Sequence, residues 1–285
     1  MQTIEFPAAD GFLLSAFLAE PKTSSKGVIL LCTGLGIPKE FYKKYVAFLS
    51  EQGYTALVFD YRGINLSKDK AISEEVINLR NWGSKDMVGA VTWLKDKYPQ
   101  QALYLFGHSI GGQVAGLMEN YKLIDRYIFF CSTTGHYTAF GFPLNIFTWF
   151  MFQIHIPITT RLFGYMPQSL TYRGVSIAKG VALEWARWSR QRDYIRAFFG
   201  KSITSEYYAD ISQSIDWIYF TDDPIATKKA VGSMLDYYPN APITPHLLNP
   251  SDLNLPRIGH SGFFTSKGIS LWKYPLDLLE KGNVA

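Results

Sequence analysis

Short apolar runs separated by helical patterns dominate the chain up to residue 131 and return near its end. The runs are rich in β-branched and aromatic residues, which favour strands. They are Val28–Cys32, Thr55–Phe59, Ala102–Phe106, Tyr127–Cys131 and Trp217–Phe220. Because strands that alternate with helices are joined by crossover connections, this order predicts a mostly parallel sheet.

Apolar residues at helical spacing occupy two of the intervals between the runs. The first stripe, followed by Gly53 where a helix C-cap would lie, is Phe41, Tyr45, Phe48 and Leu49. The second, closed by Pro99, is Met87, Val88, Val91, Leu94 and Tyr98. Both predict crossover helices with one buried face. Ahead of them, Asp10-Gly11 predicts the turn of an antiparallel hairpin within residues 1–20.

A long uncharged segment interrupts this rhythm. The 34 residues between Arg126 and Arg161 include no Asp, Glu, Lys or Arg. Pro143 and Pro157 enclose only 13 of them, fewer than the roughly 20 that cross a bilayer as a helix. We therefore expect no transmembrane helix here.

The same segment has an amphipathic pattern, with Asn145, Thr148 and His155 near one helical face. A helix that lies on a membrane usually carries Lys or Arg on its polar face, and this one has none. The pattern favours a lid helix packed over the core rather than membrane contact.

The composition is that of a folded protein with a large core. Hydrophobic residues make up 47% and charged residues 18% of the chain, against roughly 25% charged in an average domain, which excludes a mainly disordered protein. The formal net charge is +4, from 28 basic and 24 acidic side chains. This excess is too small and dispersed for a nucleic-acid partner.

Cysteine usage and the N-terminal residues suggest a compartment. Cys32 and Cys131 each end an apolar run, where a reduced thiol packs as a small hydrophobe, so no disulfide framework is expected. Residues Met1–Pro7 lack the basic and apolar regions of a secretory signal. The sequence therefore predicts a cytoplasmic protein.

A G-x-S-x-G pattern surrounds Ser109, from Gly107 to Gly111. It follows a predicted strand and precedes a helical stretch marked by Val114, Leu117, Met118 and Tyr121. A sharp strand-to-helix turn displays a serine hydroxyl, and the flanking glycines let neighbouring segments approach. The setting predicts a nucleophilic serine; the alternative is a glycine-rich turn with an idle one.

A nucleophilic serine needs a base held by a third group. Of the five histidines, His260 stands in a loop ahead of the final helix, which makes it the candidate base. His108 adjoins the serine, and its side chain is expected to turn away.

Two adjacent carboxylates, Asp222 and Asp223, follow the last predicted strand. Adjacent loop residues point in different directions, so only one can bind the histidine, and Asp223 is favoured. Two backbone amides should hold the developing oxyanion: that of Ile110, after the nucleophile, and that of Leu35, in the loop after the first parallel strand.

The chain resembles the α/β-hydrolase superfamily, with Ser109, Asp223 and His260 in the family order. The stretch Phe59–Ser67 resembles its D-x-R-G-x-G-x-S segment, although Asn65 replaces a glycine, and Thr33 replaces the usual histidine of the oxyanion loop. Residues 162–167 and 184–188 look like a bacterial branch of predicted serine hydrolases of the esterase, lipase and serine-aminopeptidase type.

The resemblance implies an α/β fold with a mostly parallel twisted sheet, helices on both faces and an inserted helical cap. Residues 1–135 and 211–285 would form the core, and residues 136–210 the cap. Aromatic residues of the cap could line an acyl pocket or form the cap's own core. They are Phe140, Phe142, Phe147, Trp149, Phe150, Phe152, Phe163, Trp185 and Trp188.

These observations predict a serine hydrolase that cleaves a small-molecule ester or thioester with an apolar acyl part. Ser109 would attack the carbonyl, His260 would move the proton and Asp223 would orient the imidazole. No metal or organic cofactor is expected, because no His/Cys cluster has metal-ligand spacing. The alternatives are a peptidase or amidase with the same triad, and a non-catalytic binding protein on a hydrolase fold.

Overall fold

The computed structural model describes residues 1–65, 76–168 and 174–282 and centres on an eight-stranded sheet. Its order is β1 (Gln2–Pro7), β2 (Leu13–Ala19), β4 (Thr55–Phe59), β3 (Val28–Cys32), β5 (Leu103–His108), β6 (Arg126–Phe130), β9 (Ile215–Phe220) and β10 (Ile243–Leu248). Strand β2 pairs antiparallel with both β1 and β4, and the other six strands are parallel to one another. The central strands are buried from end to end, which explains why they read as continuous apolar runs.

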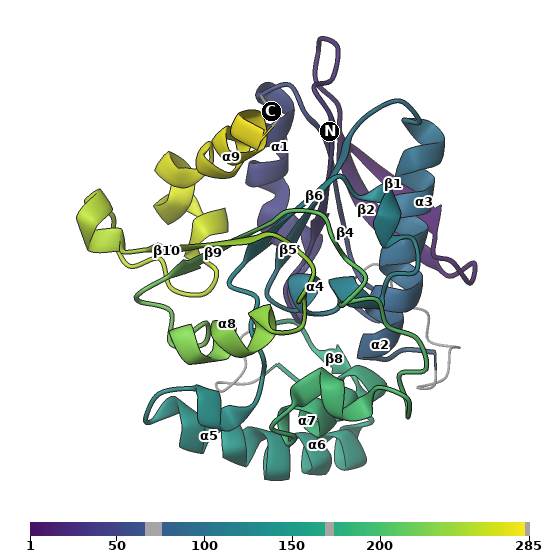
Figure 1. Cartoon of the computed structure of the whole chain (residues 1–285). Helices are drawn as coiled ribbons and strands as arrows, with labels where there is room; N and C mark the ends of the chain where they lie inside the picture. The colour runs from purple at the N-terminus through teal and green to yellow at the C-terminus, as the bar shows by residue number, and fades with distance from the viewer. Residues whose placement is uncertain (66–75, 169–173, 283–285) are drawn as a thin grey trace.

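Helices cover both faces of this sheet, as predicted (Figure 1). The core helices are α1 (Lys43–Glu51), α2 (Leu79–Asn81), α3 (Val88–Lys97), α4 (Ile110–Gln113), α8 (Lys228–Leu235) and α9 (Tyr274–Gly282). A π-helical turn, Trp82–Met87, joins α2 to α3, so the second predicted stripe forms a nearly continuous helix. A mostly parallel sheet with helices on both faces is the core architecture that the resemblance implies.

The predicted helix after Ser109 is wrong in its length. Only Ile110–Gln113 is α-helical, and two 3₁₀ turns follow at Ala115–Leu117 and Tyr121–Leu123. Three glycines lie in this stretch, each costing a helix about 1 kcal/mol relative to alanine. A β-carbon at Gly116 would collide with the ring of Tyr208, so the glycine is required by packing rather than by a helix.

The chain between β6 and β9 forms a separate lobe below the sheet in Figure 1. Its helical elements are α5 (Leu144–Phe150), a π-helical turn (Met151–His155), α6 (Ile156–Phe163) and α7 (Lys179–Ser189). Strands β7 (Tyr165–Met166) and β8 (Ile177–Ala178) form a small antiparallel sheet between α6 and α7. Pro157 does not end the helix as its position predicts, because it falls in the first turn of α6. None of the helices in the described ranges has the length and apolar character of a membrane span.

The segment that resembles D-x-R-G-x-G-x-S forms two ion pairs with other parts of the core. Asp60 accepts a hydrogen bond from Lys39 Nζ at 2.7 Å, and buried Arg62 pairs with Asp86 at 2.6 Å. Asn65 has a φ of +44°, a region that glycine and asparagine tolerate best. Leu66 and Ser67 lie outside the described residues.

Candidate active site

Ser109 lies at the sharp turn between β5 and α4, with φ +52° and ψ −114°. This backbone region is strained for a residue with a side chain and persists where the surroundings enforce it. A β-carbon on Gly107 would lie 2.7 Å from Cα of Gly112, and one on Gly111 would collide with the carbonyl oxygen of Cys32. The flanking glycines therefore let the turn fit against its neighbours.

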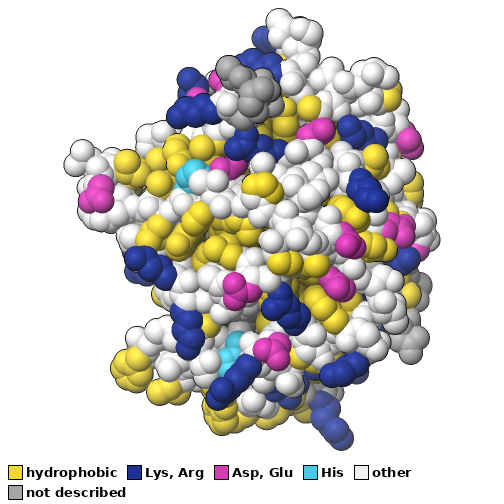
Figure 2. Space-filling view, viewed as in Figure 1, with side chains coloured by type: hydrophobic (Ala, Val, Ile, Leu, Met, Phe, Trp, Pro, Cys, Tyr) yellow, Lys and Arg dark blue, Asp and Glu magenta, His cyan; other side chains and the backbone are white. Residues whose placement is uncertain are grey.

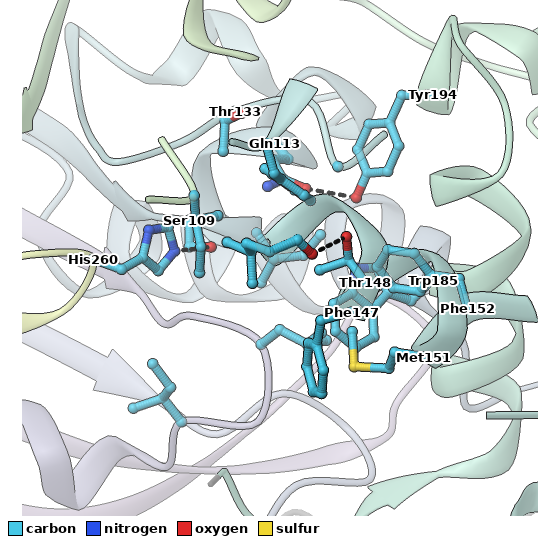
Figure 3. Close-up of a pocket in the computed structure, with 17 residues that line it drawn as sticks. Ser109, Gln113, Thr133, Phe147, Thr148, Met151, Phe152, Trp185, Tyr194 and His260 are labelled. Atoms are coloured by element: carbon cyan, nitrogen blue, oxygen red, sulfur yellow. Dashed lines mark hydrogen bonds between the residues drawn. The ribbon is translucent and has the colours of Figure 1, made fainter. Parts of the chain in front are cut away.

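Ser109, His260 and Asp223 form one hydrogen-bonded chain. His260 Nε2 lies 2.9 Å from Ser109 Oγ, and His260 Nδ1 lies 2.8 Å from Asp223 Oδ2 (Figure 3 shows the serine contact). Burial alone would raise the pKa of Asp223, but His260 and the amides of Ile225 and Ala226 outweigh it and lower that pKa. The carboxylate is therefore charged and fixed beside the imidazole.

The two adjacent carboxylates have different partners. Asp223 is buried and also accepts a hydrogen bond from Ile225 N at 2.8 Å. Asp222 accepts bonds from the amides of Ile258 and Gly259, at 2.8 and 3.0 Å. Asp222 thus anchors the loop that carries His260, and Asp223 contacts the ring itself.

His108 turns away from the pocket, as expected, and belongs to a second hydrogen-bonded chain. The phenol oxygen of Tyr42 accepts from Gly34 N at 2.8 Å, so its own proton is directed to His108 Nδ1, 2.6 Å away. His108 Nε2 is then the donor to the carbonyl oxygen of His260, at 2.9 Å. Burial and the neighbouring His260 lower the pKa of His108 to about 3, which is consistent with a neutral ring.

Two of the three other histidines, His136 and His246, have contacts away from Ser109. His246, in the edge strand β10, contacts Asp216 and the hydroxyl of Tyr274 at 2.8 and 2.9 Å. His136 bonds the hydroxyl of Thr138. Neither contacts Ser109.

A cavity of about 240 Å³ opens beside Ser109 and His260. Its wall is mostly apolar and includes residues from the core and from the lobe (Figure 3). The lining residues are Leu35, Ile37, Ser109, Ile110, Gln113, Thr133, Gly135, Phe140, Leu144, Phe147, Thr148, Met151, Phe152, Trp185, Tyr194, Ile225 and His260.

The nine aromatic residues singled out in the lobe divide into three groups. Phe140, Phe147, Phe152 and Trp185 line the cavity, and Phe147 is also exposed at 36%. Trp188 is fully buried in the lobe against Tyr194. The other four, Phe142, Trp149, Phe150 and Phe163, are exposed.

The cavity has a polar corner that the sequence pattern does not reveal. Gln113 lies one turn beyond Ser109, and its side-chain oxygen accepts from the hydroxyl of Tyr194 at 2.8 Å. Thr133 follows β6 on the same side. The spacing of Gln113 from Ser109 was the available signal, since residues four apart share a helix face.

Leu35 and Ile110 both line the cavity next to Ser109, where the two oxyanion amides are predicted. The amide of Gly34 is already bonded to Tyr42. The assignment of the second oxyanion amide to Leu35 stays a prediction.

One group of metal-ligand type occurs among the described residues, with donor atoms of Cys131, Asp223 and His260 within 4.8 Å of one another. Asp223 and His260 are hydrogen-bonded to each other. Burial, followed by the nearby Asp223 charge, raises the pKa of the Cys131 thiol well above its usual value. A protonated thiol is a poor metal ligand, so the donor set fits an acid–base pair better than a metal site.

Comparison with known proteins gives a consistent family relationship. Residues 23–155 match the family described as "Serine aminopeptidase, S33", a range that includes Ser109 but not Asp223 or His260. The chain is 24% identical over 309 residues to a protein named monoacylglycerol lipase ABHD2 from Danio rerio, covering 96% of this chain and 67% of that protein.

Solved structures share the fold over nearly the whole chain. The α/β hydrolase GrgF from Penicillium sp. has a TM-score of 0.63 and 20% identity, with 98% of each chain covered. A soluble variant of monoglyceride lipase from Saccharomyces cerevisiae has a TM-score of 0.66 and 16% identity, covering 98% of this chain and 94% of that one.

Proposed function

Because the chain belongs to the α/β-hydrolase superfamily, we propose that it is a serine hydrolase that cleaves carboxylic esters or thioesters with an apolar acyl part. The observation that carries this proposal is the Ser109–His260–Asp223 chain beside an apolar cavity. A strained serine, a base within hydrogen-bond reach and an orienting carboxylate are the parts that acyl transfer needs.

In the proposed mechanism Ser109 Oγ attacks the carbonyl carbon while its proton passes to His260 Nε2. The amides of Leu35 and Ile110 stabilise the oxyanion. His260 then gives the proton to the departing alcohol or thiol, which leaves an acyl group on Ser109. Water, activated by His260, releases the acid and restores the serine. Asp223 holds Nδ1–H and balances the imidazolium charge; its lowered pKa keeps it ionised for this role.

The cavity supports an apolar acyl group of limited length. Its volume of about 240 Å³ lies below the roughly 300–1,000 Å³ of pockets for drug-sized ligands. In Figure 3, Trp185 and Phe152 lie at the far end from His260, and their rings meet edge to face at 4.9 Å. These two rings would limit the depth available to an acyl chain.

Peptide hydrolysis is the second candidate, favoured by the description of the matching family. An aminopeptidase must bind a substrate ammonium group, which usually requires a carboxylate in the pocket. No described residue that lines the cavity is Asp or Glu. We therefore propose esters rather than peptides.

The test is hydrolysis of p-nitrophenyl esters from acetate to palmitate by the wild type and Ser109→Ala, together with labelling by a fluorophosphonate. We expect activity that is lost in Ser109→Ala and a mass increase at Ser109 alone. Cleavage of aminoacyl amides but not esters would favour the peptidase. A folded wild type that neither reacts with the probe nor cleaves either substrate would contradict the proposal and favour a non-catalytic binding protein.

A further inference from the structure

The outer surface of the lobe has a large apolar face. Of the fourteen large hydrophobic side chains that are exposed in the described residues, nine lie between residues 142 and 165. They are Phe142, Ile146, Phe147, Trp149, Phe150, Ile158, Leu162, Phe163 and Tyr165. We call these nine exposed side chains the apolar face. Patches of this kind mark interaction sites rather than ordinary surface.

The predicted packing of this segment over the core is only half right. Met151, Phe152 and Ile156 are buried, but so are the polar residues Thr148 and Thr160. Their hydroxyls donate to the carbonyls of Leu144 and Ile156 in their own helix, at 2.9 and 2.6 Å. A threonine satisfied in this way can be buried, which leaves the outer side of the helix to apolar residues.

The charge of the chain is concentrated in the same lobe. Residues 136–210 contain eight Lys and Arg against four Asp and Glu, so the whole formal net charge of +4 lies there, and the rest of the chain is balanced. Arg161 is the only Asp, Glu, Lys or Arg within residues 142–165. Figure 2 shows hydrophobic side chains along the lower edge of the molecule, with Lys and Arg side chains beside them.

The apolar face and the catalytic cavity are two sides of one helix. Thr148 and Met151 line the cavity, whereas Ile146, Trp149 and Phe150 on the same turns are exposed. A single helical layer therefore separates the candidate active site from whatever covers the face.

We propose that the apolar face docks on an anionic lipid surface. Aromatic and aliphatic side chains of residues 142–165 would enter the boundary between headgroups and acyl chains, and exposed cations of the lobe, such as Arg161 and Arg187, would face lipid phosphates. The positive charge of the lobe favours this partner over a second copy of the chain, because self-association would bring two like-charged lobes together.

The experiment is sedimentation with vesicles of phosphatidylcholine, with and without phosphatidylglycerol, using variants and controls at side chains that are all more than half exposed. Leu162→Glu and Ile158→Glu place a carboxylate in the face, at side chains 69% and 51% exposed. Leu13→Glu and Ile269→Glu are the controls, at side chains 57% and 53% exposed elsewhere. We expect the face variants to bind anionic vesicles about tenfold more weakly than the wild type, and the controls to bind unchanged.

Added salt and Arg161→Gln should also weaken binding, since part of the attraction is electrostatic. Ser109→Ala should bind like the wild type, which separates this proposal from the proposed chemistry. Circular dichroism and thermal unfolding check that each variant, Ser109→Ala included, is folded. Absence of binding, equal binding to neutral vesicles, or equal loss in face and control variants would overturn the proposal. A wild-type dimer that Leu162→Glu dissociates, without vesicle binding, would show that the face joins two copies.

Discussion

The phenol of Tyr42 links the predicted oxyanion loop to the elbow histidine, with 2.8 Å to Gly34 N on one side and 2.6 Å to His108 Nδ1 on the other. His108 continues the chain to the backbone of His260. Tyr42 and His108 are both buried, and both rings pack against Phe264. The side chains of Tyr42 and His108 therefore connect the predicted oxyanion loop, through Gly34, to the loop that carries His260.

Tyr42→Phe removes the hydroxyl and leaves a buried amide and a buried ring nitrogen without their partner. We expect the free energy of unfolding to fall by about 1–3 kcal/mol. Because the oxyanion loop and base loop lose their link, kcat should fall by up to about a hundredfold with a smaller change in KM. Urea unfolding and ester hydrolysis measure the two effects.

Tyr45→Phe is the matched control. Tyr45 is as fully buried as Tyr42 and packs against the same Phe264, but its hydroxyl has no hydrogen-bond partner in the described part of the chain. Its removal should leave stability and kcat unchanged or improved. If both phenylalanine variants behave alike, Tyr42 acts through packing and not through the hydrogen-bonded chain.

Replacing each of the two neighbouring aspartates in turn should distinguish the catalytic carboxylate from the one that anchors the loop of His260. Asp223→Asn should lower kcat by about four orders of magnitude, because an amide cannot hold the histidine tautomer or balance its charge. Asp222→Asn keeps one acceptor for the amides of Ile258 and Gly259 and should lower kcat far less, by under about a hundredfold. Steady-state kinetics on one ester decides this, and the reverse ranking would transfer the acid role to Asp222.

The sheet and the elbow could be predicted because their residues produce strong local patterns. The five central strands appear as apolar runs since both faces are covered, and the runs differ from the observed strands by at most two residues at either end. Strand β10 is not recognised in the same way. It contains Pro245 and is only half-buried, which a strand tolerates because it lies at the sheet edge.

The contacts that depend on tertiary packing could not be predicted from the sequence. Tyr42 falls between Phe41 and Tyr45 of the predicted stripe, and nothing in the period indicates its bond to His108. The outward apolar face is hidden for a similar reason: hydrophobic periodicity defines two sides of a helix but not which one meets the core. His260 and Asp223 could be selected in advance only because the reaction requires a base and an acid after the elbow serine.

The stability of the protein should fall as the pH drops, in part through His108. Its pKa is lowered from 6.5 to about 3 in the folded state, by burial and by His260, so only the unfolded chain takes up this proton between those values. The His108 contribution is therefore complete above about pH 6.5 and decreases toward pH 3, by at most about 1.4 kcal/mol per pH unit. Urea unfolding across this range should give a shallower slope for His108→Gln than for the wild type. Equal slopes would mean that His108 is protonated in the fold or does not titrate on unfolding.

Replacing Trp185 should change which esters the protein prefers. The indole lines the far part of the cavity and packs edge to face on Phe152 at 4.9 Å, so Trp185→Leu should deepen the space for an acyl chain. Each added methylene that gains apolar contact contributes about 1–3 kcal/mol to specificity, and the ratio of kcat/KM for dodecanoate over butanoate should rise at least about tenfold. Trp188→Leu is the control, because Trp188 is buried against Tyr194 and does not line the cavity. A rise in the ratio for Trp188→Leu alone, or for neither variant, would place the acyl chain outside this cavity.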